Sequence, residues 1–313
     1  MGFFLLSGFV IYYSAHKHLA EGFFSYFKKR FVRIYSVFIP LLIVVWFLDN
    51  HYKTQPGFYK ELIGNLLMLQ DFNYMKPGVI VPTVFGIFPL WSLSYEWWFY
   101  MLFFPIARYV AIDRQKHLVG IAGIVAAFSY LAYPCIVNRI LVYLPTWWIG
   151  VEIARLFCND RSTVTLRKLR WPVLYVLATA APLAVYALWF SANGGHSSFG
   201  LHPWIEPRHL VASISLLLLA FAWRKLGWFG FSWTVGPAMF VSSISYAIYI
   251  AHWPLVVTAS YLSFIKNDAL RYSFYIIGLI IFCLVTELIV FRWMRKWAGR
   301  RPPATRLPVP SAL

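Results

Sequence analysis

Charged side chains are scarce in this chain of 313 residues. They make up 12% of the sequence, whereas ordinary soluble domains carry about 25%. Hydrophobic residues reach 60% and aromatic residues 20%. This balance excludes an ordinary soluble domain and predicts an all-α fold, a polytopic membrane helix bundle, because helices satisfy their own backbone hydrogen bonds in lipid.

Cysteines and recognisable cofactor motifs are scarce too. The three cysteines lie far apart and form no C-x-x-C pair, so neither a disulfide framework nor a cysteine zinc site is expected. The three histidines between residues 196 and 209 match no zinc signature, and H-E-x-x-H, glycine-rich phosphate loops and G-x-S-x-G are absent. We therefore expect no metal and no bound cofactor.

Long apolar runs dominate what is present. They predict about nine transmembrane helices, over residues 2–15, 34–48, 89–111, 117–136, 139–157, 172–190, 208–223, 238–262 and 272–292. Segment 58–71 is apolar but short and charged at both ends, which predicts an interfacial helix. The tail 300–313 is rich in Pro and Arg and is expected to be disordered.

The net charge of +17 is distributed unevenly along the chain. If residue 1 lies outside, the inner segments between spans hold 21 of the 28 Lys and Arg residues and the outer segments hold seven. Cytoplasmic loops collect Lys and Arg, so we expect the N-terminus outside and the C-terminus in the cytoplasm. The charge then reflects topology in a lipid bilayer and requires no nucleic-acid partner. Any one of these cations can instead serve only to anchor the protein at the phospholipid headgroups.

Glu96 is the first candidate for chemistry. It lies a few positions inside an apolar run, with the aromatic residues Trp91 and Tyr95 before it and Trp97, Trp98 and Tyr100 after it. A carboxylate at the centre of a spanning helix costs about 3 kcal/mol and faces a cavity or a partner in most cases. The alternatives are a side chain that reaches the interface and a structural pair with an arginine.

A second polar group lies near the C-terminus. Ser245, Tyr249 and His252 are spaced at i, i+4 and i+7, which places them on one helix face. Pro254 then interrupts the backbone hydrogen bonding. A polar stripe of this kind faces the bundle interior, where a histidine can be a hydrogen-bonded structural residue or a base.

Arginines and further intramembrane acids complete the candidates. Arg30 and Arg33 share one helix face at an inner end, and their planar guanidinium groups suit phosphate, although lipid headgroups offer the same chemistry. Ser7 beside Gly8 favours helix packing. Two acids are expected to form structural pairs, Glu152 with Arg155 and Glu287 with Arg292.

Four motifs appear in one order: F-F-x-x-S-G-F at Phe3–Phe9, R-x-x-R at Arg30–Arg33, W-S-L-S-x-E at Trp91–Glu96 and S-Y-x-x-Y-x-x-H-x-P at Ser245–Pro254. Together they resemble the acyltransferase 3 family of integral membrane acyltransferases, which O-acetylate surface polysaccharides, lipopolysaccharide and nodulation factors. The resemblance covers essentially the whole chain. It implies a membrane-embedded acyltransferase domain over residues 1–299, in the inner (plasma) membrane.

The resemblance also implies an activity and a set of site residues. The family moves an acyl group, usually acetyl, from cytoplasmic acyl-CoA as cosubstrate to a hydroxyl of a polysaccharide or lipid-linked sugar. Arg30 and Arg33 would contact the donor, and Glu96 and His252 would be catalytic groups in a central cavity. Further residues would line the cavity or bind the acceptor: Ser7, Trp91, Tyr95, Trp98, Ser245 and Tyr249.

The chain departs from the family pattern at its start. The family has ten spans, and its first span carries a basic residue followed, eleven positions later, by a histidine thought to be the catalytic base. This sequence begins at the second span, in the middle of a helix, so we expect Met1 to be internal to a longer reading frame. Two other interpretations remain: a transporter or flippase with an intramembrane Glu/His relay, and a catalytically inactive truncated relative.

Overall fold

The computed structural model describes residues 1–48, 55–160 and 164–299. The predicted tail 300–313 lies outside these described residues. Over the described residues the chain is all-α, as predicted, with one isolated bridge between Gln70 and Val81. Its elements are α1 (Gly2–Ala15), η1 (His16–Glu21), α2 (Phe23–Leu48), α3 (Phe58–Leu66), η3 (Val84–Gly86), α4 (Leu90–Tyr109), α5 (Ile112–Ala132), α6 (Ile136–Asn159), α7 (Arg170–Ala192), α8 (Ile205–Lys225), α9 (Phe231–Thr234), η5 (Gly236–Ile244), α10 (Ser245–His252), η6 (Trp253–Val257), α11 (Asp268–Leu284), η7 (Val285–Val290) and α12 (Phe291–Gly299).

Six helical segments among the described residues are long and apolar enough to cross a membrane: Phe23–Leu48, Ile136–Asn159, Arg170–Ala192, Ile205–Lys225, Gly236–Val257 and Asp268–Gly299. The polytopic membrane architecture is therefore confirmed. The other three predicted spans correspond to helices as well, but α1 has only 14 residues. Helix α4 is rich in Trp and Tyr, and α5 begins with charged residues, so both are less apolar.

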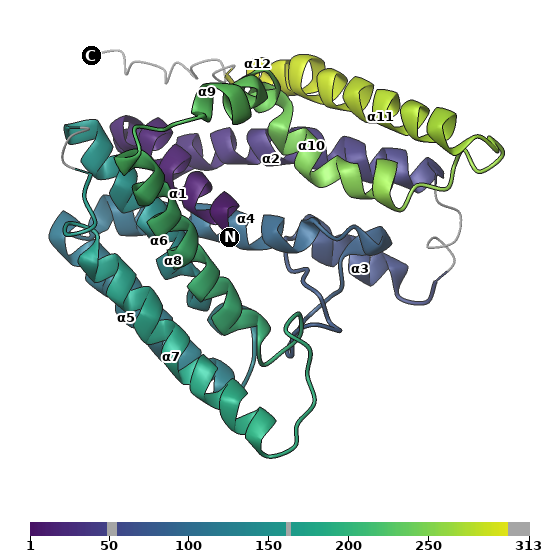
Figure 1. Ribbon diagram of the computed structural model, residues 1–313. Helices are drawn as coiled ribbons and strands as arrows, with labels where there is room; N and C mark the ends of the chain where they lie inside the picture. The colour runs from purple at the N-terminus through teal and green to yellow at the C-terminus, as the bar shows by residue number, and fades with distance from the viewer. Residues whose placement is uncertain (49–54, 161–163, 300–313) are drawn as a thin grey trace, which may run out of the picture.

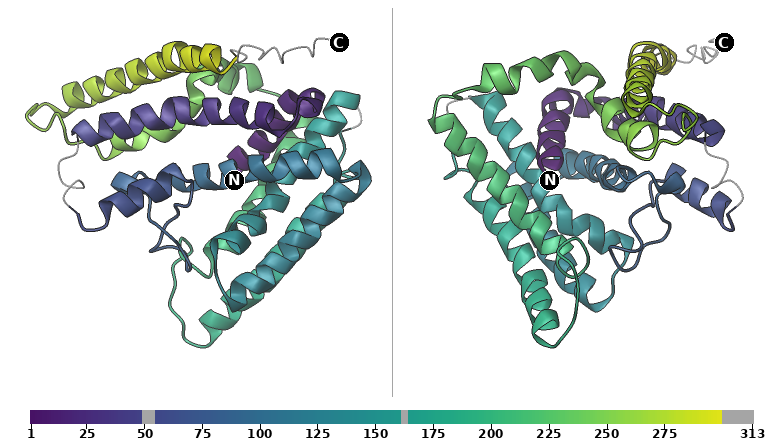
Figure 2. Two further views of the ribbon diagram at one scale, coloured as in Figure 1. Left: turned by 180° about the vertical axis from the view of Figure 1, so that it is seen from behind. Right: turned by 45° about the vertical axis from the view of Figure 1, so that its right-hand side comes forward.

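The helices form two groups. Helices α5, α6, α7 and α8 pack on one another, and α2 packs on α10, η7 and α12. Between the groups lie α1, which packs mainly on α6, and α4, which contacts α2, α5 and α6. Figures 1 and 2 show α1 at the centre of this arrangement, with the N-terminus near the middle of the molecule. Residues on α1 and α4 therefore face both groups.

The segments predicted to lie inside, so far as the structure describes them, gather at one end of the bundle, which we call the basic end: residues 16–33, 108–116, 155–160, 164–171, 224–225 and 292–299. Two contacts join segments far apart in sequence there. The ammonium of Lys28 lies 5.9 Å from the ring centroid of Trp297, and Arg224 Nη1 donates to the carbonyl oxygen of Val164 at 2.6 Å.

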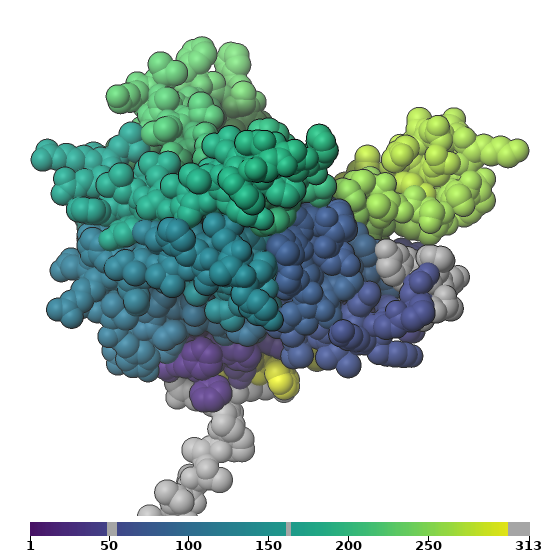
Figure 3. Space-filling model, turned by 90° about the horizontal axis from the view of Figure 1, so that it is seen from below, coloured from purple at the N-terminus to yellow at the C-terminus, as the bar shows by residue number. Residues whose placement is uncertain are grey.

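The segments predicted to lie outside meet at the opposite end. The rings of Phe88 and Trp253 are 5.1 Å apart, and the His202 backbone N–H donates to the carbonyl oxygen of Met75 at 2.9 Å. Segment 58–71, predicted as one interfacial helix, is helical only over α3 and then enters a turn at Leu67. In Figure 3 the segment that follows α3 (blue) forms the face beside the projecting α10–α11 connection (yellow-green).

Two glycines allow α1 and α6 to approach closely. A Cβ built on Gly8 would collide with the carbonyl oxygen of Trp147, and one built on Gly150 would collide with the carbonyl oxygen of Leu5. Small residues at membrane helix crossings let backbones come together in this way. The pair of glycines therefore sets the separation of α1 from the α5–α8 group.

We predict that Gly150→Ala lowers stability although alanine is the better helix former. The overpacked crossing should destabilise the protein by about 1–3 kcal/mol, measured as a lower midpoint of thermal unfolding in detergent. The matched control is Gly278→Ala on α11, where the nearest atom to a built Cβ is 3.8 Å away. An unchanged or raised midpoint for Gly150→Ala would show that the crossing has room for a methyl group.

Candidate functional site

Glu96 is held in the interior by groups from three helices. Its side chain is 5% exposed. Ser7 Oγ on α1 donates to Glu96 Oε1 at 2.8 Å, and the hydroxyl of Tyr100, one turn further along α4, donates to the same oxygen. Trp147 Nε1 on α6 donates to Ser7 Oγ at 3.1 Å. The close α1–α6 crossing thus fixes the serine that orients the carboxylate.

The second carboxylate oxygen of Glu96 has a different environment. Oε2 is buried, and no hydrogen-bond partner reaches it among the described residues. Leaving a buried acceptor unpaired costs about 1–3 kcal/mol, and more for a charged group. The burial does not fit a side chain that reaches the membrane interface. The carboxylate therefore has one oxygen fixed by the protein and one buried oxygen without a hydrogen-bond partner among the described residues.

Both arginines of the R-x-x-R motif are held by partners on other helices. Arg33 Nη1 pairs with Glu287 Oε2 at 2.5 Å, and its guanidinium lies 5.2 Å from the ring centroid of Tyr246. Arg30 Nη2 donates to Ser14 Oγ at 3.1 Å. The two cations therefore lie on the side of Glu96 towards the basic end, held by partners on η7 and α1.

The expected pair of Glu287 with Arg292 is wrong, because Glu287 binds Arg33 on α2 instead. Residues five apart on a helix do not share a face. A residue on a helix packed against that face can reach the carboxylate instead. Glu287 lies in the π-helical segment η7, which interrupts the long helix from α11 to α12. The expected pair of Glu152 with Arg155 is confirmed, with Arg155 Nη1 and Glu152 Oε1 2.8 Å apart.

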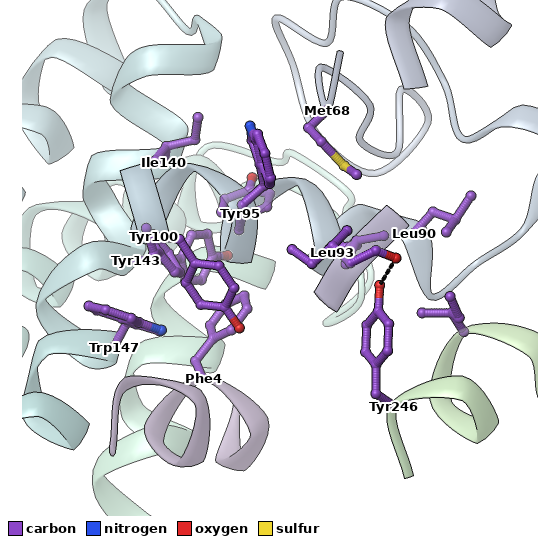
Figure 4. Packing of buried hydrophobic residues seen from close by; sticks show 14 of the residues in the cluster. Phe4, Met68, Leu90, Leu93, Tyr95, Tyr100, Ile140, Tyr143, Trp147 and Tyr246 are labelled. Atoms are coloured by element: carbon purple, nitrogen blue, oxygen red, sulfur yellow. Dashed lines mark hydrogen bonds between the residues drawn. The ribbon is translucent and has the colours of Figure 1, made fainter. Parts of the chain in front are cut away.

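Figure 4 shows how the surroundings of this group are arranged. The Tyr100 ring lies beside Phe4 and Trp147, and its hydroxyl is on the side that faces Tyr246 of α10. Tyr246 donates to the carbonyl oxygen of Ile34 at 3.2 Å. Side chains from both helix groups therefore lie around Tyr100.

The three polar residues predicted to share one face of α10 lie in different environments. Ser245 is exposed and donates to the carbonyl oxygen of Ser242 at 2.8 Å. The hydroxyls of Tyr249 and Ser92 are 2.6 Å apart. His252 Nδ1 lies 2.8 Å from the carbonyl oxygen of Tyr249. Because a carbonyl only accepts, Nδ1 carries the proton, and Nε2 of a neutral ring has the free lone pair.

The aromatic residues around Glu96 in the sequence turn mainly towards segment 68–76. The Tyr95 hydroxyl donates to Asp71 Oδ2 at 2.5 Å, and Trp98 Nε1 donates to the carbonyl oxygen of Met68 at 2.9 Å. The Lys76 ammonium lies 4.4 Å from the ring centroid of Trp91. The structure therefore does not bring Trp91, Tyr95 and Trp98 into the hydrogen-bonded group at Glu96.

Lys76, Asp71 and Arg139 form a buried charge cluster near the end opposite the basic end, and the sequence gives no signal for it. Lys76 Nζ is 3.4 Å from Asp71 Oδ1, and Arg139 Nε is 3.8 Å from Asp71 Oδ2. Burial lowers the pKa of the Lys76 ammonium, and the Asp71 carboxylate beside it acts in the opposite direction. This cluster ties segment 68–76 to α4 and α6.

Sequence reasoning missed two members of the Glu96 group. Tyr100 is four residues after Glu96, and helical spacing could have found it. Trp147 lies in an apolar run on a distant helix and carries no such signal. Among the residues that the structure describes, no group of three His, Cys, Asp or Glu side chains could hold a metal ion.

Comparisons with known proteins agree with this picture. The family Acyl_transf_3, described as an acyltransferase domain, matches residues 1–288. A protein of Komagataeibacter xylinus described as a putative membrane-bound transacylase, BcsY, is 26% identical over 223 residues, 69% of this chain and 53% of the relative. The acyltransferase MdmB of Streptomyces mycarofaciens is 31% identical over 134 residues, 40% of this chain and 32% of the relative.

No solved structure matches the chain. The alignments span about half and about a third of the two relatives, whereas the family match covers nearly the whole of this chain. The chain therefore belongs to the acyltransferase 3 family, membrane-bound enzymes that transfer acyl groups.

Proposed function

We propose that this protein is an O-acyltransferase of the inner (plasma) membrane that transfers an acyl group, most simply acetyl, from cytoplasmic acyl-CoA to a hydroxyl of a cell-surface polysaccharide or lipid-linked sugar. The observation that carries the proposal is the Glu96 carboxylate, buried in the interior with Oε2 unpaired among the described residues. The membership in a family of acyl transferases supports the reaction class.

The reaction forms an ester bond and breaks a thioester bond. The acceptor hydroxyl oxygen attacks the thioester carbonyl carbon, the hydroxyl loses its proton to a base, and the thiol of CoA leaves with a proton. Glu96 Oε2 accepts a hydrogen bond from the acceptor hydroxyl, or from the base that deprotonates it. Ser7 and Tyr100 fix the other oxygen, which keeps the carboxylate in one orientation.

Arg30 and Arg33 hold the donor on the side of Glu96 towards the basic end. Guanidinium groups bind phosphate oxygens in a bidentate manner. Glu287 and the Tyr246 ring fix the position of Arg33. The donor enters from the basic end because this end is cytoplasmic by the positive-inside rule.

The acceptor approaches from the opposite end. His252 and Tyr249 lie towards that end, and the free Nε2 of His252 can bind a sugar hydroxyl. Trp91 and Trp98 are half-buried and keep ring surface for stacking on a sugar. Tyr95 is buried and bound to Asp71, so in this proposal it positions segment 68–76 and does not stack on the acceptor.

Replacing Glu96 tests the proposal most directly. We predict that Glu96→Gln lowers transfer from radiolabelled acetyl-CoA to the glycan and lipid fractions of host membranes by at least about 100-fold, because a carboxylate that orients a catalytic base and stabilises its charge is lost. Glutamine keeps the shape of the side chain and can still accept from Ser7. Glu61→Gln on α3 is the matched control and should retain activity. Normal transfer by Glu96→Gln, at wild-type protein levels, would refute the role of Glu96.

Variants of Arg33 and Glu287 can separate an effect on donor binding from an effect on folding stability. Arg33→Gln leaves a buried carboxylate unpaired, so we predict a loss of stability of about 3–5 kcal/mol and a higher KM for acyl-CoA. The double variant Arg33→Gln/Glu287→Gln should recover most of the thermal stability and keep the high KM. Lys29→Gln, an exposed cation at the same end, is the control. A double variant with wild-type KM would assign Arg33 a purely structural role.

A further inference from the structure

A polar cavity of about 590 Å³ lies at the basic end, between the start of α5, the end of α6 and the segment before α7. Five basic side chains line it: Lys116, Arg155, Arg167, Lys168 and Arg170. The acidic lining residues are Asp113 and Glu152. The excess of cations gives the cavity a positive potential, which favours an anionic ligand.

Arg155 is a fixed part of this cavity. Its Nη1 binds Glu152 Oε1 at 2.8 Å, and its Nη2 donates to Gln115 Oε1 at 2.5 Å. Trp148 Nε1 donates to the same oxygen of Glu152 at 3.0 Å. The negative charge of Glu152 is thus paired with Arg155 within the protein. Lys116, Arg167, Lys168 and Arg170 outnumber the remaining acid, Asp113, so the cavity keeps a net positive charge for a ligand.

An aromatic ring completes the cavity. Trp171 lines it and is 43% exposed, and the guanidinium carbon of Arg170 lies 5.7 Å from its ring centroid. An exposed tryptophan next to several cations suits a ligand that has both a flat base and phosphate groups, because bases stack on aromatic side chains and phosphates pair with Arg and Lys.

The cavity and the R-x-x-R motif lie around the same turn of α1. The guanidinium carbon of Arg155 is 5.4 Å from the ring centroid of Tyr12, and Arg30 donates to Ser14 two residues later. Residues two apart on a helix point to different sides, so the cavity and Arg30 flank this end of α1 from two sides. A CoA thioester is an elongated anion, with a phosphorylated adenosine at one end and the acyl group at the other.

We propose that this cavity binds the 3′-phosphorylated adenosine end of the acyl donor, with Trp171 under the base and Arg167, Lys168 and Arg170 on the phosphates. The identity of the ligand rests on the proposed function, whereas the presence of a phosphate site rests on the cavity alone. Lipid headgroups carry phosphate too, so the test must separate a nucleotide from a lipid.

The test uses the full chain, purified in detergent, and adenosine 3′,5′-bisphosphate as the probe in calorimetry. We expect binding to the wild type, and at least tenfold weaker binding to Arg167→Gln/Lys168→Gln. The control Arg114→Gln/Lys225→Gln removes two exposed cations at the same end that do not line the cavity, and it should change affinity less than twofold. Equal loss in both double variants, or no binding to the wild type, would overturn the proposal.

Two further arms identify the ligand. Trp171→Ala should weaken the bisphosphate more than inorganic phosphate, whereas Trp189→Ala, an exposed tryptophan at the other end of α7, should affect neither. Native mass spectrometry with phosphatidylglycerol added tests the lipid. The wild type could retain the lipid, the variant Arg167→Gln/Lys168→Gln could lose it, and neither could bind the bisphosphate. That result would identify the ligand of the cavity as a lipid headgroup and overturn the nucleotide assignment.

Activity separates this proposal from the proposed function. An increased KM for acyl-CoA in Arg167→Gln/Lys168→Gln, with little change in kcat, supports both. Transfer with unchanged KM in that variant refutes the cavity as a donor site and leaves the function intact. Bisphosphate binding at the cavity without transfer from any acyl-CoA refutes the function and retains the nucleotide site.

Discussion

The arrangement of this protein depends on one contact, the hydrogen bond from Ser7 to Glu96. A carboxylate inside a membrane protein is tolerated only where polar groups compensate its desolvation. Here the compensation comes from α1, which must lie against α6 to deliver the serine, and the glycines at the crossing make that approach possible. The packing of α1 and the orientation of the candidate catalytic acid are thus the same structural feature.

The position of α1 between two helix groups also explains how several functional residues come together. Arg30 and Arg33 belong to the group of α2, and Trp147 belongs to the group of α6. Residues of α1 and α4 contact both. The R-x-x-R motif and the cavity at Arg155 contact the last turns of α1 from different sides. The same helix carries Ser7, which binds Glu96, so α1 runs from the basic end to the interior around Glu96.

Several features could be predicted from the sequence because they depend on composition and local spacing. Apolar runs and the scarcity of charged residues predicted a polytopic helical membrane protein, and the four motifs predicted the family. The pair of Glu152 with Arg155 followed from helical spacing. The pair of Glu287 was predicted wrongly, because its true partner, Arg33, is 254 residues away and comes close only through packing of η7 on α2.

The sequence by itself determined that this chain folds in a lipid bilayer and to which family it belongs. Both depend only on which residue types occur and in what order. Tertiary structure alone decided which polar groups share one environment. Glu96, Ser7 and Trp147 carry no mutual signal along the chain, and Tyr95 lies one residue before Glu96 yet bonds to Asp71. Successive residues on a helix point in different directions, so their partners depend on which helices pack against each face.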